Sequence, residues 1–378
     1  MKKILLLGAI LALSTLTISA QSLDTPPSGD NQKASVTQYI GGMAKVTVNY
    51  SSPDVTGPSG EDRKGKIWGQ LVPYGLTNLG FGNGNPGPWR AGANENTVIK
   101  FSHDVKIEGR DLPAGAYGLH LIVNETGPWT WIFSKNTTQW GSYFYNEADD
   151  ALRVDVDPQS TEHTEWLTYE FIDRQPTSAT LALKWESKLV PMRIEVKDYN
   201  DVYVHHFSRQ LEGAAGFNYQ NWVAASQFCV NNNTNLEKAL VWADAAINAP
   251  FVGVKNFATL QNKAAVLMKM DKMDEAEETM MAAVEDPGAN PGQIHQFGRQ
   301  LIGMGLKDKA LKLFEYNYER FNGAWPTNVG MARGLAAVGR YDEALKYAEL
   351  AHEEAPDQLN KDGMKAAVEK LKMKQDIN

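Results

Sequence analysis

One short segment, residues 89–95 with the sequence WRAGANE, combines side chains that suit recognition of a small polar molecule. Arg90 offers a planar fork of hydrogen-bond donors, Asn94 offers a donor and an acceptor, and Glu95 offers an acceptor. Trp89 adds an aromatic face on which a ligand can stack. We therefore expect this segment to bind a small polar ligand, such as a sugar or a carboxylate.

The same segment also allows a structural interpretation. Gly92 stands between two alanines and permits a close backbone approach that bulkier residues would block. Arg90 would pair with Glu95, or with another acid, and fix the loop against the strand expected at residues 97–101. The sequence leaves both interpretations open.

Two further turns carry side chains that are expected to converge on the same end of the domain. Arg63 lies in one and Tyr74 in the other. The candidate ligand-binding residues are therefore Arg63, Tyr74, Trp89, Arg90, Asn94 and Glu95.

Tryptophan is concentrated in the same region, and this raises an alternative function. Six of the ten tryptophans lie between residues 68 and 166. They suit aromatic platforms for sugar rings, which would make the protein glycan-binding or glycan-acting. Core packing is the competing interpretation, since Trp129 and Trp131 would share one face of a single strand.

Catalytic and metal-binding patterns are missing from the sequence. The seven histidines are scattered, only one cysteine is present, and neither an H-E-x-x-H nor a G-x-S-x-G motif occurs. We therefore predict no catalytic residue, no metal and no cofactor. The net charge of −8 makes nucleic acid or an anionic membrane surface an unfavourable partner.

The start of the chain has the pattern of a secretory signal peptide over residues 1–20: a basic start, an apolar stretch and a small residue at Ala20. That stretch is shorter than the roughly 20 residues that a permanent membrane span needs, so we expect no membrane insertion. The polar, proline-containing residues 21–33 are predicted to be a flexible leader. Together these features indicate export to the periplasm or the extracellular space.

Residues 34–198 are expected to form a β domain. About ten short runs rich in β-branched and aromatic residues are separated by turns, with no amphipathic helix between them. This pattern predicts an antiparallel β-sandwich, jelly-roll-like in its connections. Residues 76–88 are rich in glycine and proline and are expected to form a long irregular loop with a binding role or high mobility.

A repeat of about 34 residues dominates the second half of the chain. Ala239, Ala276, Ala310 and Ala344 are separated by 37, 34 and 34 residues, and each begins a similar pattern of small and bulky residues. Such a period predicts stacked helical hairpins over residues 211–374, after a junction at 199–210. The expected helix pairs are 211–229 with 235–249, 255–270 with 272–285, 291–304 with 306–321, and 325–338 with 340–354, followed by an end helix at 357–374.

These units, above all Met273-Asp274-Glu275-Ala276 and Tyr341-Asp342-Glu343-Ala344-Leu345, resemble tetratricopeptide repeats. The resemblance implies an α-solenoid with a concave groove that holds a peptide or another protein. The sequence shows no obvious cluster of groove lysines and arginines that would capture a terminal carboxylate.

The first half resembles a family of secreted bacterial domains of unknown function, found in envelope proteins of Gram-negative bacteria. The matching segments are VTVNYSSP at 46–53, RKG at 63–65, GQLVPYG at 69–75, WRAGANE at 89–95, LPAGAY at 112–117, WG at 140–141 and LRV at 152–154. In that family the Pro-Tyr-Gly turn runs almost directly into Trp-Arg, whereas residues 76–88 intervene here. The resemblance implies no reaction.

The sequence as a whole thus predicts an exported, non-enzymatic scaffold of the bacterial cell envelope. The helical groove would bind a polypeptide, and the β domain would bind a second ligand.

Overall fold

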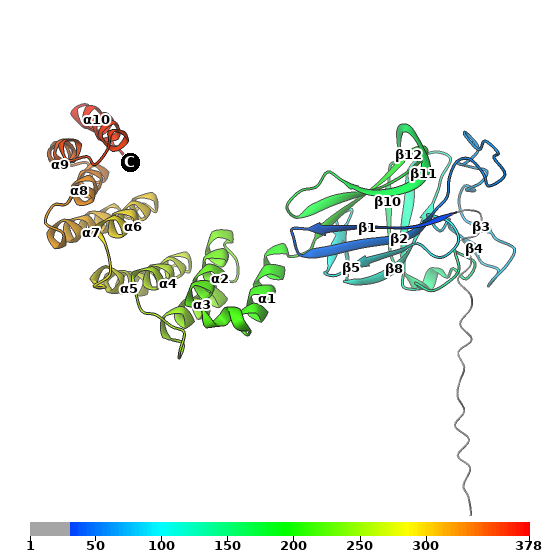
Figure 1. Cartoon of the computed structure of the whole chain (residues 1–378), viewed down its shortest axis with the longest axis horizontal. Helices are drawn as coiled ribbons and strands as arrows, with labels where there is room; N and C mark the ends of the chain where they lie inside the picture. The colour runs from blue at the N-terminus through cyan, green and yellow to red at the C-terminus, as the bar shows by residue number, and fades with distance from the viewer. Residues whose placement is uncertain (1–30) are drawn as a thin grey trace, which may run out of the picture. The chain divides into compact units, whose positions relative to one another are not determined.

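The computed structural model describes residues 31–378, which fall into two compact units. The first ends at Tyr199 and the second begins at Asn200, and we call them the β unit and the helical unit (Figure 1).

The predicted signal peptide and most of the predicted leader lie outside the described residues. The last residues of the leader, 31–33, are described. Gln32 and Lys33, predicted to be flexible, form the start of the first strand, because they pair with Ser52 and Ser51 of the second.

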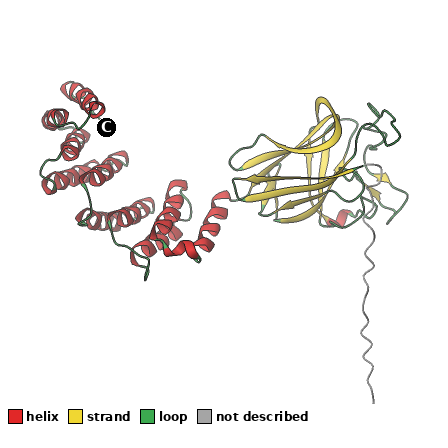
Figure 2. Ribbon diagram, in the orientation of Figure 1, coloured by secondary structure: helices red, strands yellow, loops and turns green. Residues whose placement is uncertain are grey.

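The β unit contains two larger antiparallel sheets and a small one, drawn in yellow in Figure 2. The six-stranded sheet consists, in spatial order, of β1 (Gln32–Ile40), β2 (Ala44–Ser52), β5 (Val98–Phe101), β8 (Gly115–Ile122), β9 (Trp129–Ser134) and β10 (Asp150–Val156). The four-stranded sheet consists of β11 (Gln159–Ile172), β12 (Ser178–Val196), β6 (Val105–Ile107) and β7 (Arg110–Leu112), and the small sheet of β3 (Thr77–Asn78) and β4 (Pro86–Gly87). The predicted antiparallel β region is confirmed.

Alternating side chains explain these strands. In β2, Ala44, Val46 and Val48 are buried, and polar residues between them face outward. The predicted hairpin joins β1 to β2 through Gly41 and Gly42, which have φ values of +61° and +77°. A side chain would be strained in that conformation.

Tryptophan side chains fill much of the interior of the β unit. Trp131 and Trp185 are at most 1% exposed. The Trp68 ring lies 4.9 Å from Trp129, 5.7 Å from Trp89 and 5.8 Å from Trp185, measured between ring centroids. Core packing therefore accounts for these five tryptophans.

The predicted irregular loop, residues 76–88, is held against a second loop. Its ends pair as β3 and β4, with Thr77 opposite Gly87. The side chain of Asn83 donates a hydrogen bond to the carbonyl of Tyr145, at 2.8 Å. Phe81 packs edge-on against Tyr143.

The helical unit begins with α1 and continues as helix pairs. Its helices are α1 (Tyr199–Leu211), α2 (Tyr219–Asn232), α3 (Leu236–Asn248), α4 (Phe257–Lys269), α5 (Met273–Glu285), α6 (Pro291–Gly303), α7 (Lys307–Arg320), α8 (Trp325–Ala337), α9 (Tyr341–Glu353) and α10 (Gln358–Lys372). The predicted junction at 199–210 is thus helical. None of the helices in residues 31–378 has the length and hydrophobicity that crossing a membrane requires.

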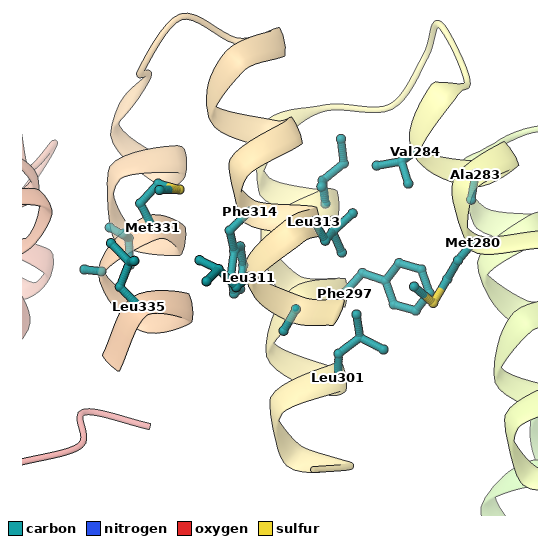
Figure 3. Close-up of a cluster of buried hydrophobic side chains, with 14 of the residues drawn as sticks. Met280, Ala283, Val284, Phe297, Leu301, Leu311, Leu313, Phe314, Met331 and Leu335 are labelled. Carbon is teal, nitrogen blue, oxygen red and sulfur yellow. The ribbon is translucent and has the colours of Figure 1, made fainter. Parts of the chain in front are cut away.

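Small residues permit the close packing of neighbouring helices, as the repeat predicts. Ala239, Ala276, Ala310 and Ala344 are at most 1% exposed. Larger side chains then fill the spaces between helices. Figure 3 shows Phe297 directed toward Met280 and Phe314 facing the helix that carries Met331.

Candidate functional site

The predicted site segment, residues 89–95, is anchored at its start by Trp89. The backbone N–H of Trp89 donates to the Leu121 carbonyl at 3.1 Å, and Leu121 donates back at 2.8 Å. The indole N–H donates to the carbonyl of Gly92 at 3.1 Å, and the ring stacks on Trp185 at 5.9 Å. Trp89 is therefore engaged in packing rather than available as a stacking platform.

The backbone after Trp89 adopts an uncommon conformation that the surrounding strands hold. Ala91 and Asn94 have φ values of +47° and +53°. The carbonyl of Ala91 accepts hydrogen bonds from the Thr97 hydroxyl at 3.2 Å and the Tyr169 hydroxyl at 2.8 Å. Gly92 allows the backbone to approach Thr97 closely, as expected from the sequence, because a Cβ atom at this position would lie only 2.6 Å from Thr97 Oγ1.

Arg90 closes the loop on itself. Its Nη1 donates to the carbonyl of Asn94 at 2.7 Å, and its guanidinium carbon lies 5.5 Å from the centre of the Tyr143 ring. Gly141 makes room for this group, because a Cβ at that position would lie 2.6 Å from Arg90 Cζ. These contacts hold the loop, but the partners of Arg90 are a backbone carbonyl and an aromatic ring rather than Glu95 or another acid, which the structural interpretation predicts.

Glu95 has other partners. Its carboxylate accepts from Lys33 Nζ at 2.9 Å and from the Ser51 hydroxyl at 3.0 Å. Burial by itself raises the pKa of Glu95, but these hydrogen bonds outweigh it and hold the pKa below its usual value. Glu95 is therefore ionised at neutral pH.

Glu95 lines an open hollow of about 410 Å³, which we call the β hollow. It is lined by Lys33, Ala34, Ser35, Asn49, Tyr50, Ser51, Glu95 and Asn96. Asn96 is 8% exposed, and its Oδ1 has no hydrogen-bond partner among the described residues. An ammonium, a carboxylate, two amides and a phenol thus surround a space large enough for a small polar molecule.

The other predicted site residues do not line this hollow. Arg63 forms an ion pair with Glu61, and the ring of Tyr74 covers Gly69. The side chain of Asn94 accepts a hydrogen bond from Asn31 at 3.3 Å. Of the six predicted residues, Glu95 alone lines the β hollow.

A buried serine–histidine pair was missed by motif reasoning. His120 is completely buried, and its Nδ1 lies 2.9 Å from the hydroxyl oxygen of Ser142. On the other side of the ring, Gln139 Nε2 lies 3.3 Å from His120 Nε2. His120 and Ser142 are both at most 2% exposed, so the pair lies in the interior of the β unit.

The helical unit contains a larger hollow of about 580 Å³, formed by α2, α4 and α6, which we call the amide hollow. Its lining residues are Gln227, Val230, Asn231, Gln261, Asn262, Ala265, Met268, Lys269, Phe297, Gln300 and Met304. Five carboxamides thus stand around an apolar floor. Sequence reasoning missed these residues, although Gln227 and Gln261 are separated by one 34-residue repeat.

Asn262 distinguishes the amide hollow from an ordinary helix surface. This side chain is 2% exposed, and neither its Nδ2 nor its Oδ1 has a hydrogen-bond partner among the described residues. An unpaired buried amide costs about 1–3 kcal/mol. A ligand that reached these two atoms would need to offer both an N–H and a C=O.

Comparison with known families finds a match for the β unit. Residues 31–194 match the family described as "Protein of unknown function (DUF2911)". The predicted resemblance to a family of unknown function is therefore confirmed. A comparison with curated proteins finds no match.

Solved structures similar to this chain include tetratricopeptide repeat proteins and several named MamA. A mutant of MamA is 14% identical and has a TM-score of 0.28; the match covers 41% of this chain and 81% of that one. YrrB, "a TPR protein with an unusual peptide-binding site", is 19% identical and has a TM-score of 0.27; the match covers 44% of this chain and 86% of that one. A tetratricopeptide repeat protein from Parabacteroides merdae is 16% identical and has a TM-score of 0.28; the match covers 42% of this chain and 66% of that one.

Proposed function

We propose that this protein is a non-enzymatic binding protein whose helical unit holds a polypeptide in the amide hollow. The observation that carries the proposal is the pairing of an apolar floor with five carboxamides, one of which, Asn262, is buried without a partner. A polypeptide supplies the matching groups, since each peptide unit has one donor and one acceptor.

The lining of the amide hollow also suits a side chain of the ligand. Met268 and Phe297 belong to the buried core and form part of the floor. Methionine adapts its shape to different apolar partners. We therefore expect the bound segment to place an apolar side chain on this floor while Gln261 and Gln300 bond its backbone.

Peptide selection on the full chain tests this function. Peptides enriched from a randomised library are expected to bind the full chain, and replacing Gln261 and Gln300 together by alanine should weaken binding about tenfold. Gln296→Ala is the matched control, because this exposed glutamine lies on α6 outside the hollow. No enriched peptide, or equal binding by all three proteins, would refute the proposal.

The β hollow is our proposed site for the second, small ligand. Its ionised Glu95 suits a ligand with hydroxyl or amino groups, and Lys33 suits one with a carboxylate. The test is a screen of small polar metabolites by thermal shift, followed by Asn49→Ala as a variant that alters the lining. A ligand that stabilises both proteins equally would lie elsewhere.

Glycan binding stays a second candidate because several large aromatics of the β unit are exposed. Phe81, Trp140 and Phe144 are 67%, 53% and 46% exposed, and Phe81 contacts Phe144 with ring centroids 6.0 Å apart. A stacking surface for sugars would use these residues rather than Trp89. Binding to a glycan array that disappears in Trp140→Ala would support this function, and an array without binding would exclude the glycans that it carries.

We also propose export and a jelly-roll-like sandwich. The basic start and apolar stretch before Ala20 support export to the periplasm or extracellular space. The inward alternation of residues in two antiparallel sheets supports a sandwich. Fusion of residues 1–33 to a reporter active only outside the cytoplasm tests the first; an experimental structure of the β unit tests the second.

A further inference from the structure

The last repeats contain a second hollow, and its charge differs from that of the amide hollow. Helices α6, α8 and α10 surround about 380 Å³, to which they contribute Arg299, Arg333 and Lys370 respectively. No Asp or Glu of the described chain is among its lining residues. We call this the basic hollow; it gathers cations that are far apart in the sequence, where no cluster was apparent.

These cations form no close ion pair within residues 31–378, although the charge of Asp376 acts on Arg333. None of Arg299, Arg333 and Lys370 forms a salt bridge within residues 31–378; the ion pairs of the helical unit involve other side chains. Burial and the charge of Arg299 lower the pKa of Arg333, and the charge of Asp376 opposes them only in part. The neighbouring His295 has its pKa lowered to about 4, mainly by burial, and is neutral at pH 7. An anion in this hollow would relieve the repulsion between the arginines.

The repeat register shows where the lining changes. One row of positions, spaced by 34 residues, reads Gln227, Gln261, His295, Val329 and Gly363. A second row reads Asn231, Ala265, Arg299, Arg333 and Ala367. The second row thus becomes cationic at α6, with Arg299, and at α8, with Arg333, whereas the first row stays neutral. Helix α6 lines both hollows.

The chain itself shows that the basic hollow accepts a peptide unit. Ile377 lies in its wall, with its side chain packed against the core of the helical unit. Arg333 Nη1 donates to the carbonyl of Ile377 at 3.2 Å. A backbone carbonyl and an aliphatic side chain are therefore already accommodated there.

We propose that the basic hollow binds an acidic segment of the same polypeptide that occupies the amide hollow. Carboxylates of Asp or Glu side chains would bind Arg299 and Lys370, and an apolar neighbour would pack near Ile377. This inference rests on the proposed function and adds the partner's chemistry: a partly apolar stretch next to an acidic one.

The experiment selects peptides of random sequence, with amidated C-termini, on the full chain and on the double variant Arg299→Gln/Lys370→Gln. Both residues are exposed, so the variant should fold normally, which circular dichroism checks. Peptides from the unmodified chain should be enriched in Asp and Glu. Their affinity, measured by fluorescence anisotropy, should fall about tenfold in the double variant and depend less on salt there. The control variant is Lys312→Gln, because Lys312 is exposed on α7 and lies outside the hollow. This substitution should leave the peptide affinity unchanged.

The outcomes separate this inference from the function on which it rests. Selected peptides that need Gln261 and Gln300 but show no acidic enrichment would overturn the inference and leave the proposed function standing. Binding that requires a free C-terminal carboxylate would overturn the assignment to acidic side chains. Selection that yields no binding peptide would overturn both.

Discussion

Phe314 of α7 packs directly over Gly298 of α6, where any Cβ would overlap its ring. The same ring, which is completely buried, also lies against α8, and Cβ atoms added to Gly330 and Gly334 would come within 2.7 and 2.8 Å of it. One phenylalanine thus occupies a space that three glycines leave open. Figure 3 shows this residue beside Leu311, on the side of α7 that faces Met331 and Leu335.

Gly298→Ala should therefore destabilise the helical unit. Alanine favours a helix by about 1 kcal/mol over glycine, but crowding in a packed core costs typically 1–3 kcal/mol, and Phe314 is held on its other side. We expect a net loss of about 1 kcal/mol in urea denaturation. In a Phe314→Leu background the same substitution should become neutral or stabilising, and equal losses in both backgrounds would contradict this packing.

Much of the helical unit was predictable from the sequence because its packing is local and repeated. The alanine ladder gave the helix pairs to within a few residues, except for the first, where α2 starts at Tyr219 rather than near residue 211. The basic hollow was not predictable in the same way. Lys370 lies in the end helix, three residues beyond Ala367, which is the position equivalent to Arg299 and Arg333, so only the folded chain brings the three cations together.

The candidate site in the β unit shows a different limit. Residue types in WRAGANE indicate hydrogen-bonding capacity, but the partners come from distant strands. Arg90 donates a hydrogen bond to Asn94 and lies over the Tyr143 ring, whereas Glu95 accepts hydrogen bonds from Lys33 and Ser51. Which of these side chains faces a hollow depends on strand pairing, which the sequence alone did not specify.

Arg90→Ala should lower the stability of the β unit without affecting peptide binding by the helical unit. Loss of a hydrogen bond from a charged group costs about 1.5–3 kcal/mol, and part of the Tyr143 ring would lose its cover. Lys100→Ala, at an exposed position of β5, is the control and should be nearly neutral. Unchanged stability in Arg90→Ala, measured by tryptophan fluorescence in urea, would argue that this side chain is retained for a ligand.

The pH dependence of stability should include a contribution from His120. Burial lowers the pKa of this imidazole to about 3, with a smaller contribution from the charge of Arg90, whereas in the unfolded chain its pKa is about 6.5. Below about pH 6.5 the unfolded state therefore binds a proton that the folded state does not, and stability falls as the pH drops toward about 3.

Replacement of His120 by Gln should remove this contribution. The variant should be less stable at pH 7, because it loses contacts to Ser142, yet its stability should fall less steeply between about pH 6 and 4. Urea denaturation at several pH values measures both effects. Parallel pH profiles for the two proteins would contradict a buried, neutral His120.

Asn262→Leu should change stability and binding in opposite directions. Leucine removes two unpartnered amide atoms from a buried position, so we expect the free energy of unfolding to rise by about 1 kcal/mol. Peptide affinity should fall, since the ligand loses a donor and an acceptor. A variant that is destabilised, or that binds the selected peptides normally, would show that this amide has another role.

Photocrosslinking tests most directly whether the first helices of the repeats hold a polypeptide. A benzophenone amino acid replaces Gln261, which lines the amide hollow, or Lys346, which is exposed on α9, and a selected peptide is added to each protein. We predict that the peptide crosslinks at position 261 and not at position 346. Crosslinking at position 346 alone, or equally at both, would contradict the central claim.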